Sequence, residues 1–97
     1  MMDLSKYTGF EWDKGNIDKS FKKHKISPNE SEEIFLDESL LVQEDLSHSQ
    51  QEQRFIAIGK TVSKKLLLTV FTIRNYKIRI ISVRIADHKE RRHYEKS

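Results

Sequence analysis

The spacing of apolar residues changes near residue 40 of this 97-residue chain. Before that point it is helical: Ile17, Phe21 and His24 fall at i, i+4 and i+7, which places them along one stripe of a helix. After that point apolar and polar residues alternate with the period of two that is typical of strands. The pattern therefore predicts helices in the first half of the chain and a sheet in the second.

Two helices are expected before the sheet. The first begins at Asn16 or Asp18. The second has a clearer start, because Ser27 is a hydroxyl N-cap, Pro28 takes the first helical position and Glu30 follows three residues after the cap. This second helix should end near residue 37 or 38.

Four strands are expected after the helices, joined as antiparallel hairpins. The third is apolar on both faces and is therefore predicted to be central. Phe10–Trp12 also alternates and predicts a further short strand near the N-terminus. The four predicted strands are Leu40–Glu44, Arg54–Lys60, Leu66–Ile73 and Lys77–Ile85, with a polar loop at Ser47–Gln53 and a turn at Asn75-Tyr76.

A last helix is predicted from Asp87 to the C-terminus, because Asp87 and Glu90 repeat the capping pattern. Tyr94 is nearly its only apolar residue, so this helix should pack lightly or against a partner. The predicted fold is α+β: two N-terminal helices, a four-stranded antiparallel sheet with the short N-terminal strand in addition, and a C-terminal helix. We expect one domain spanning residues 1–97.

The composition argues against several classes of protein. The chain has no cysteine, so it has no disulfides and a zinc site would lack thiolates. Its longest mostly apolar run, Leu66–Phe71, is far too short to cross a bilayer. The N-terminus has no basic stretch followed by an apolar one, so it does not resemble a secretory signal. We expect a cytoplasmic protein with no membrane partner.

Charge is divided unevenly along the chain. Residues 1–48 hold six Lys or Arg and eleven Asp or Glu, a net −5, whereas residues 49–97 hold twelve and four, a net +8. Residues 30–45 contain seven acids and no Lys or Arg. This division indicates a basic surface suited to a polyanion, although an unevenly charged solvated surface gives the same pattern.

No cofactor or metal site is expected. None of the three glycines lies in a phosphate loop, a dinucleotide fingerprint or the turn of a catalytic nucleophile. The histidines are scattered and form no ligand motif; they are His24, His48, His88 and His93.

The most informative segment is residues 74–92, which interleaves cations with β-branched residues. Along a regular strand Arg79 and Arg84 face opposite sides, and they converge only if a bulge intervenes at Ile80-Ile81. Guanidinium groups match phosphate oxygens in pairs, so converging arginines would hold a polyanion backbone. Cations that protect an edge strand from aggregation are an equally good interpretation.

Three other positions have both a structural and a chemical interpretation. His24 lies on an apolar stripe, where a core histidine is commoner than a catalytic base. Glu52 and Arg54 share a strand face, and they are either an ion pair that shapes the loop or a proton-transfer acid beside an arginine. Tyr94, with Arg91 one turn earlier, is expected to anchor the last helix rather than to stack on a base.

Several segments are informative when they are taken in order along the chain. They are Phe10-Glu11-Trp12-Asp13, Asn16 leading to Lys23-His24-Lys25-Ile26, the helix end at residues 33–37, Glu52-x-Arg54-Phe55-Ile56-Ala57-Ile58-Gly59, Arg79-Ile80-Ile81-Ser82-Val83-Arg84 and Glu90-Arg91-Arg92-x-Tyr94. Together these segments resemble the BrnT family of bacterial type II toxins. Lys25 stands where that family usually has glycine, and Ile85 stands where proline is common.

The resemblance implies a RelE-like fold and a metal-independent ribonuclease that inhibits translation. It also implies neutralisation by a BrnA-like antitoxin with a ribbon-helix-helix domain, and contact with operator DNA only through the toxin–antitoxin complex. At the matching positions, the residues implied to stabilise transition-state charge are Arg79 and Arg84. The candidates for holding the RNA backbone are Arg54, Arg74, Lys77 and Arg91. The base and acid are not assigned by the sequence; the candidates are Glu52 and His24.

Two other functions use the same residues. The chain is alternatively a non-catalytic nucleic-acid-binding or co-repressor protein, in which the arginines only contact phosphates, or a protein-interaction module. Three results distinguish these functions. RNA cleavage in the presence of a chelator indicates the ribonuclease, and salt-sensitive binding without cleavage indicates the nucleic-acid-binding protein. No RNA affinity at low salt indicates the protein-interaction module.

Overall fold

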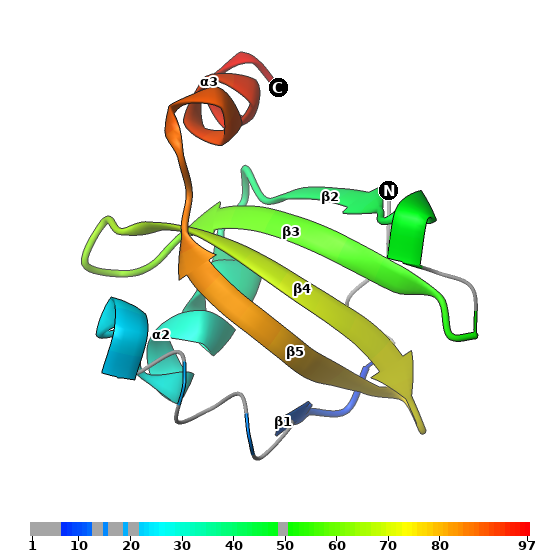
Figure 1. The fold of residues 1–97 in the computed structure, drawn as a ribbon. Helices are drawn as coiled ribbons and strands as arrows, with labels where there is room; N and C mark the ends of the chain where they lie inside the picture. Colours follow the sequence, from blue (N-terminus) through cyan, green and yellow to red (C-terminus); the bar gives the residue numbers. More distant parts are fainter. Residues whose placement is uncertain (1–6, 13–14, 16–18, 20–21, 49–50) are drawn as a thin grey trace.

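The computed structural model describes residues 7–12, 15, 19, 22–48 and 51–97. The strands are β1 (Phe10–Trp12), β2 (Leu41–Glu44), β3 (Arg54–Lys60), β4 (Leu66–Arg74) and β5 (Lys77–Ile85), and the helices are α2 (Pro28–Glu33) and α3 (His88–Lys96). The strands form one sheet with the order β1-β5-β4-β3-β2. α2 and α3 lie on opposite sides of this sheet (Figure 1).

The four predicted strands are confirmed, each within one residue of its predicted limits, and they pair antiparallel in chain order. The apolar β4 is the middle strand, as predicted. Asn75 and Tyr76 form the turn between β4 and β5 with φ values of 51° and 60°. Positive φ at both residues is the form of two-residue turn whose twist matches that of a hairpin.

The prediction of a four-stranded antiparallel sheet is wrong in one respect, because the sheet has five strands and is mixed. β1 pairs parallel with β5, with Phe10 opposite Ile78 and Trp12 opposite Ile80. Parallel strands cannot be joined by a tight turn, and here α2 and the other strands intervene between the two. Three alternating residues give neither the partner nor the direction of such a strand.

α2 begins as predicted. The Ser27 hydroxyl accepts from the Glu30 N–H at 3.2 Å, and the Glu30 carboxylate accepts from the Ser27 N–H at 3.0 Å. The α-helix is shorter than predicted and continues as a 3-10 turn, Ile34–Leu36. The first predicted helix falls mostly outside the described residues. Within it, residues 19 and 22–24 are described and helical, and they are followed by Lys25 at φ 57°.

Apolar side chains cover both faces of the sheet. The cluster on the α2 side contains Ile26, Ile34, Ala57, Leu67, Phe71, Ile78, Ile80 and Val83. The cluster on the α3 side contains Ile58, Leu66, Leu68, Ala86 and Tyr94. Gly59 is a point of close approach, since a Cβ there would lie 3.1 Å from both the Cβ and the carbonyl oxygen of Ile34.

A bulge in β5 changes which side chains share a face. Phe71 of β4 pairs with Ile80, but the neighbouring Val70 pairs with Ser82, so Ile81 is the extra residue on β5. The bulge shifts the alternation by one position. As a result, Arg79 and Arg84 face the same side of the sheet, which is the side that carries α3. The sequence predicted this shared face only if a bulge intervened.

Candidate functional site

The side of the sheet that carries α3, here termed the α3 face, presents its side chains in rows that cross the strands. Directly paired residues have Cβ atoms about 5 Å apart. The first row is Arg54, Thr72, Arg79 and Glu11; the second is Gln43, Ile56, Val70 and Ser82; the third is Leu41, Ile58, Leu68 and Arg84. α3 packs on the third row, and the second row carries the exposed Gln43 and Ser82.

Arg79 is oriented in the first row by a carboxylate. Its guanidinium lies 3.6 Å from Glu11, which also lies 3.8 Å from the ammonium of Lys77. The Arg79 side chain is 27% exposed. Its charge is therefore held against the sheet and is still reachable by a ligand on the α3 face.

Arg84 is engaged by the start of α3. Its two terminal nitrogens donate to the two oxygens of Glu90 at 2.7 and 2.6 Å. Glu90 also accepts the N–H of the N-cap residue Asp87 at 2.9 Å. The hydrogen bonds from Arg84 hold the pKa of Glu90 below its usual value, and Glu90 raises the pKa of Arg84. Arg84 thus joins β5 to α3 as well as presenting charge.

Tyr94 fixes the other end of α3, as its predicted role as an anchor requires. It is buried, and its hydroxyl donates to Asp37 at 2.6 Å. Asp37 also accepts backbone N–H groups of Lys60 at 2.8 Å and Ser39 at 2.9 Å. Burial and the contact with Asp37 raise the pKa of Tyr94 to about 12.

The far end of the α3 face, at the β4–β5 turn, is rich in cations. Arg74 donates to Glu52 at 2.6 Å and lies opposite Lys77 in the hairpin. Arg54 occupies the adjacent first row with Arg79. The structure therefore brings most of the predicted backbone-binding residues to one end of the α3 face, while Arg91 lies apart on α3.

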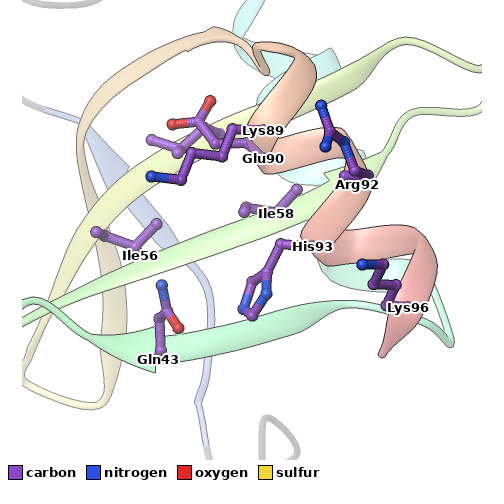
Figure 2. Close-up of a pocket in the computed structure, with 9 residues that line it drawn as sticks. Gln43, Ile56, Ile58, Lys89, Glu90, Arg92, His93 and Lys96 are labelled. Carbon is purple, nitrogen blue, oxygen red and sulfur yellow. The ribbon is translucent and has the colours of Figure 1, made fainter.

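A groove of about 680 Å³ separates α3 from the β2 side of the sheet (Figure 2). Its floor is apolar, and its walls are polar or charged. The lining residues are Gln43, Ile56, Ile58, Leu68, Lys89, Glu90, Arg92, His93 and Lys96.

His24 is not brought to the α3 face. It belongs to the helical turn 22–24 beside α2 (Figure 1) and lies two residues before Ile26, which is buried in the core on the α2 side. The sheet separates His24 from Arg79 and Arg84, so the structure does not assemble these three predicted catalytic residues into one cluster.

The groove and the role of Glu11 were not predicted from the sequence. The carboxylate of Glu11 belongs to the segment Phe10-Glu11-Trp12 that carries the resemblance, which was the available signal. Gln43 and His93 are fifty residues apart and meet only because α3 folds back over β2. No local pattern indicates such a meeting.

The α3 face offers closely spaced cations to a ligand. Guanidinium and ammonium groups bind phosphate oxygens, so the surface suits a phosphodiester chain. Within residues 7–12, 15, 19, 22–48 and 51–97, no three His, Asp or Glu side chains come together as a metal ion requires. No helix in this described part of the chain has the length and apolar character needed to span a membrane.

Comparison with known proteins places this arrangement in a family. The family described as "Ribonuclease toxin, BrnT, of type II toxin-antitoxin system" matches residues 12–90. A crystal structure of the Brucella abortus ribonuclease toxin BrnT shares the fold, with a TM-score of 0.63, 22% sequence identity, and coverage of 84% of this chain and 99% of that one. Comparison with curated protein sequences gives no match. Because the family match spans most of the chain, the resemblance is confirmed: this chain belongs to the BrnT family of ribonuclease toxins of type II toxin–antitoxin systems.

Proposed function

We propose that the chain is a metal-independent, RelE-like endoribonuclease that inhibits translation when its antitoxin is absent. The observation that supports this proposal is the bulge at Ile81, which places Arg79 and Arg84 on one face with Ser82 between them. Two guanidinium groups on one face of the sheet can both reach the phosphate oxygens of a single RNA chain.

The reaction that suits such a surface is attack by a ribose 2′-hydroxyl on the adjacent phosphate. The O2′–P bond forms while the P–O5′ bond breaks, which leaves a cyclic phosphate on one product and a 5′-hydroxyl on the other. One group removes the 2′ proton and another protonates the leaving oxygen. Arg79 and Arg84 stabilise the negative charge that develops on the phosphate oxygens.

Proton transfer is assigned to carboxyl groups that contact arginines rather than to His24. Glu52, which contacts Arg74, remains the candidate from the sequence. Glu11 is added because it lies beside Arg79. The RNA backbone is held by Arg54, Arg74, Lys77 and Arg91, and orientation of the RNA by these residues lowers the barrier further.

The partners follow from membership of the family. A type II toxin is accompanied by an antitoxin, and we propose a BrnA-like protein with a ribbon-helix-helix domain. Operator DNA is contacted only by the toxin–antitoxin complex, and both proteins act in the cytoplasm. The RNA substrate is the only other partner in this proposal.

A non-catalytic nucleic-acid-binding or co-repressor function is the second candidate. One observation favours it: both Arg79 and Arg84 contact carboxylates, Glu11 and Glu90, which offset part of the charge that catalysis requires. Such pairs still orient guanidinium groups toward phosphates, so binding alone is consistent with this geometry.

Expression in bacteria and cleavage by the purified protein distinguish these two functions. The wild-type chain should arrest growth without the antitoxin and cleave RNA in the presence of EDTA. Arg79→Ala should lower the cleavage rate by about 10²-fold, the usual effect of removing one group that stabilises transition-state charge. Salt-sensitive RNA binding by the wild type without cleavage would favour the co-repressor instead.

Arg84 needs a paired test because it also holds α3. Arg84→Ala removes both its charge and its contact with Glu90, whereas Glu90→Gln weakens the contact and keeps the charge. If Arg84 stabilises the transition state, Arg84→Ala abolishes growth arrest, Glu90→Gln retains it, and both variants still bind the antitoxin. Equal loss in both variants would assign Arg84 a positioning role only.

A further inference from the structure

The groove between α3 and β2 has an apolar floor that suits the face of a flat ring. Ile56, Ile58 and Leu68 form this floor, and all three belong to the α3 face. The groove volume, about 680 Å³, lies within the range of small-molecule sites, roughly 300–1,000 Å³. A nucleobase that leaves the stack can pack its face against apolar side chains of this kind.

Two polar side chains face each other across that floor. Gln43 extends from β2 toward the groove, and the His93 imidazole extends from α3 toward β2 (Figure 2). A glutamine amide carries a donor and an acceptor side by side, the combination that makes paired hydrogen bonds with the edge of a base. An imidazole supplies a ring on which a base can stack.

The rim of the groove is cationic. Lys89, Arg92 and Lys96 line it along one side of α3. The single acid in the lining, Glu90, is bound by both terminal nitrogens of Arg84. The net charge therefore favours a ligand that carries phosphates.

We propose that this groove binds one unpaired base of the RNA substrate and that Gln43 selects the base by hydrogen bonding to its edge. This inference deepens the proposed ribonuclease function and rests on it for the substrate, single-stranded RNA. Gln43 lies in the row next to that of Arg54 and Arg79. Adjacent rows on one strand face are about 7 Å apart, so a base in the groove leaves its phosphates beside those arginines.

An acidic segment of a protein is the other occupant that cationic walls admit. It is the less favoured one, because the Gln43 amide and the His93 ring match a base edge and a base face, neither of which a carboxylate side chain provides.

The test measures base preference separately from cleavage. Binding of 2′-O-methyl homo-oligomers of A, C, G and U, which lack the attacking hydroxyl, is followed by fluorescence anisotropy. The wild type should prefer one base by about tenfold, the discrimination expected of one bidentate contact. Gln43→Leu should reduce this preference to within about twofold. Gln51→Leu is the matched control, because Gln51 is exposed and lies outside the groove lining; it should keep the preference.

Equal binding of the four oligomers by the wild type, or an unchanged preference in Gln43→Leu, would overturn the inference. Binding of poly-glutamate that Gln43→Leu weakens, while oligomer binding is unaffected, would assign the groove to a protein and also overturn it. Failure of the ribonuclease function is distinguishable from failure of the base site. If only the ribonuclease function fails, unmodified RNA stays intact while the Gln43-dependent base preference persists, and this result supports the base site alone.

Discussion

At the scale of single residues, Lys25 adopts a backbone conformation that usually requires glycine. It follows the helical residues 22–24 with φ 57°, the left-handed conformation that ends many helices. A residue with a Cβ pays roughly 1–2 kcal/mol for this conformation. The sequence resemblance singled out this position as one where glycine is expected, and the positive φ of Lys25 gives the physical reason.

Lys25→Gly should therefore stabilise the protein. Relief of the left-handed strain exceeds the entropy that glycine adds to the unfolded chain, so we expect the free energy of unfolding to rise by about 0.5–1 kcal/mol. Denaturant unfolding measures this change. Lys22→Gly, at an exposed helical position nearby, is the control and should lower the free energy of unfolding by about 1 kcal/mol. A loss of stability in Lys25→Gly would contradict the argument.

At the scale of elements, local patterns were sufficient where one segment determines its own structure. The capping boxes of Ser27 and Asp87 and the four main strands follow from neighbouring residues, and they were predicted. The parallel pairing of β1 with β5 was not, because it depends on a partner nearly seventy residues away. The sequence indicated that Arg79 and Arg84 would share a face only if β5 had a bulge. It did not predict the bulge at Ile81 itself, since the shift in register arises from the pairing of β4 with β5.

The attachment of α3 depends both on a local sequence pattern and on a contact with a distant segment. Tyr94 was predicted as its anchor, but its partner Asp37 lies fifty-seven residues earlier and was not. Burial raises the pKa of Asp37, but hydrogen bonds from Tyr94 and from the backbone of Lys60 and Ser39 outweigh burial and hold this pKa below its usual value. The contact therefore requires a protonated Tyr94 and an ionised Asp37, and it is limited at both ends of the pH range.

Stability should consequently fall in alkali through Tyr94. The pKa of Tyr94 is about 12 in the folded chain, against an ordinary value of 10.0, so the protonated side chain favours folding fully below pH 10 and progressively less up to about pH 12. The difference in free energy of unfolding between the wild type and Tyr94→Phe should shrink by about 2 kcal/mol between pH 8 and pH 11.5. Urea unfolding at the two pH values measures it. A difference that does not depend on pH would contradict the role of the hydroxyl.

At the scale of the whole molecule, the sheet lies between the start of the acidic run and the arginines of the α3 face. The acidic run at residues 30–45 begins at α2, on one side, whereas the α3 face carries the arginine row and the cations of α3. The charge counts of the two half-chains predicted a basic surface. They did not place it, because Arg54 and Arg79 share a row only through strand pairing, and Arg92 reaches the α3 face only through the return of α3.

This separation predicts which cations control the salt dependence of RNA binding. Each phosphate contact on single-stranded nucleic acid contributes about 0.7 to the slope of log K against log salt concentration. Arg92→Ala, at the rim of the groove, should therefore reduce the slope by about 0.7. Lys23→Ala removes the same charge from an exposed helical position that is followed by Ile26 of the core on the α2 side. It should leave the slope unchanged, because screening at physiological salt acts within about 8 Å. Titration of a non-cleavable RNA at four salt concentrations measures both slopes. Equal reductions of the slope in the two variants would mean that RNA binding depends on the total charge of the molecule. That result would contradict the assignment of the α3 face as the binding surface.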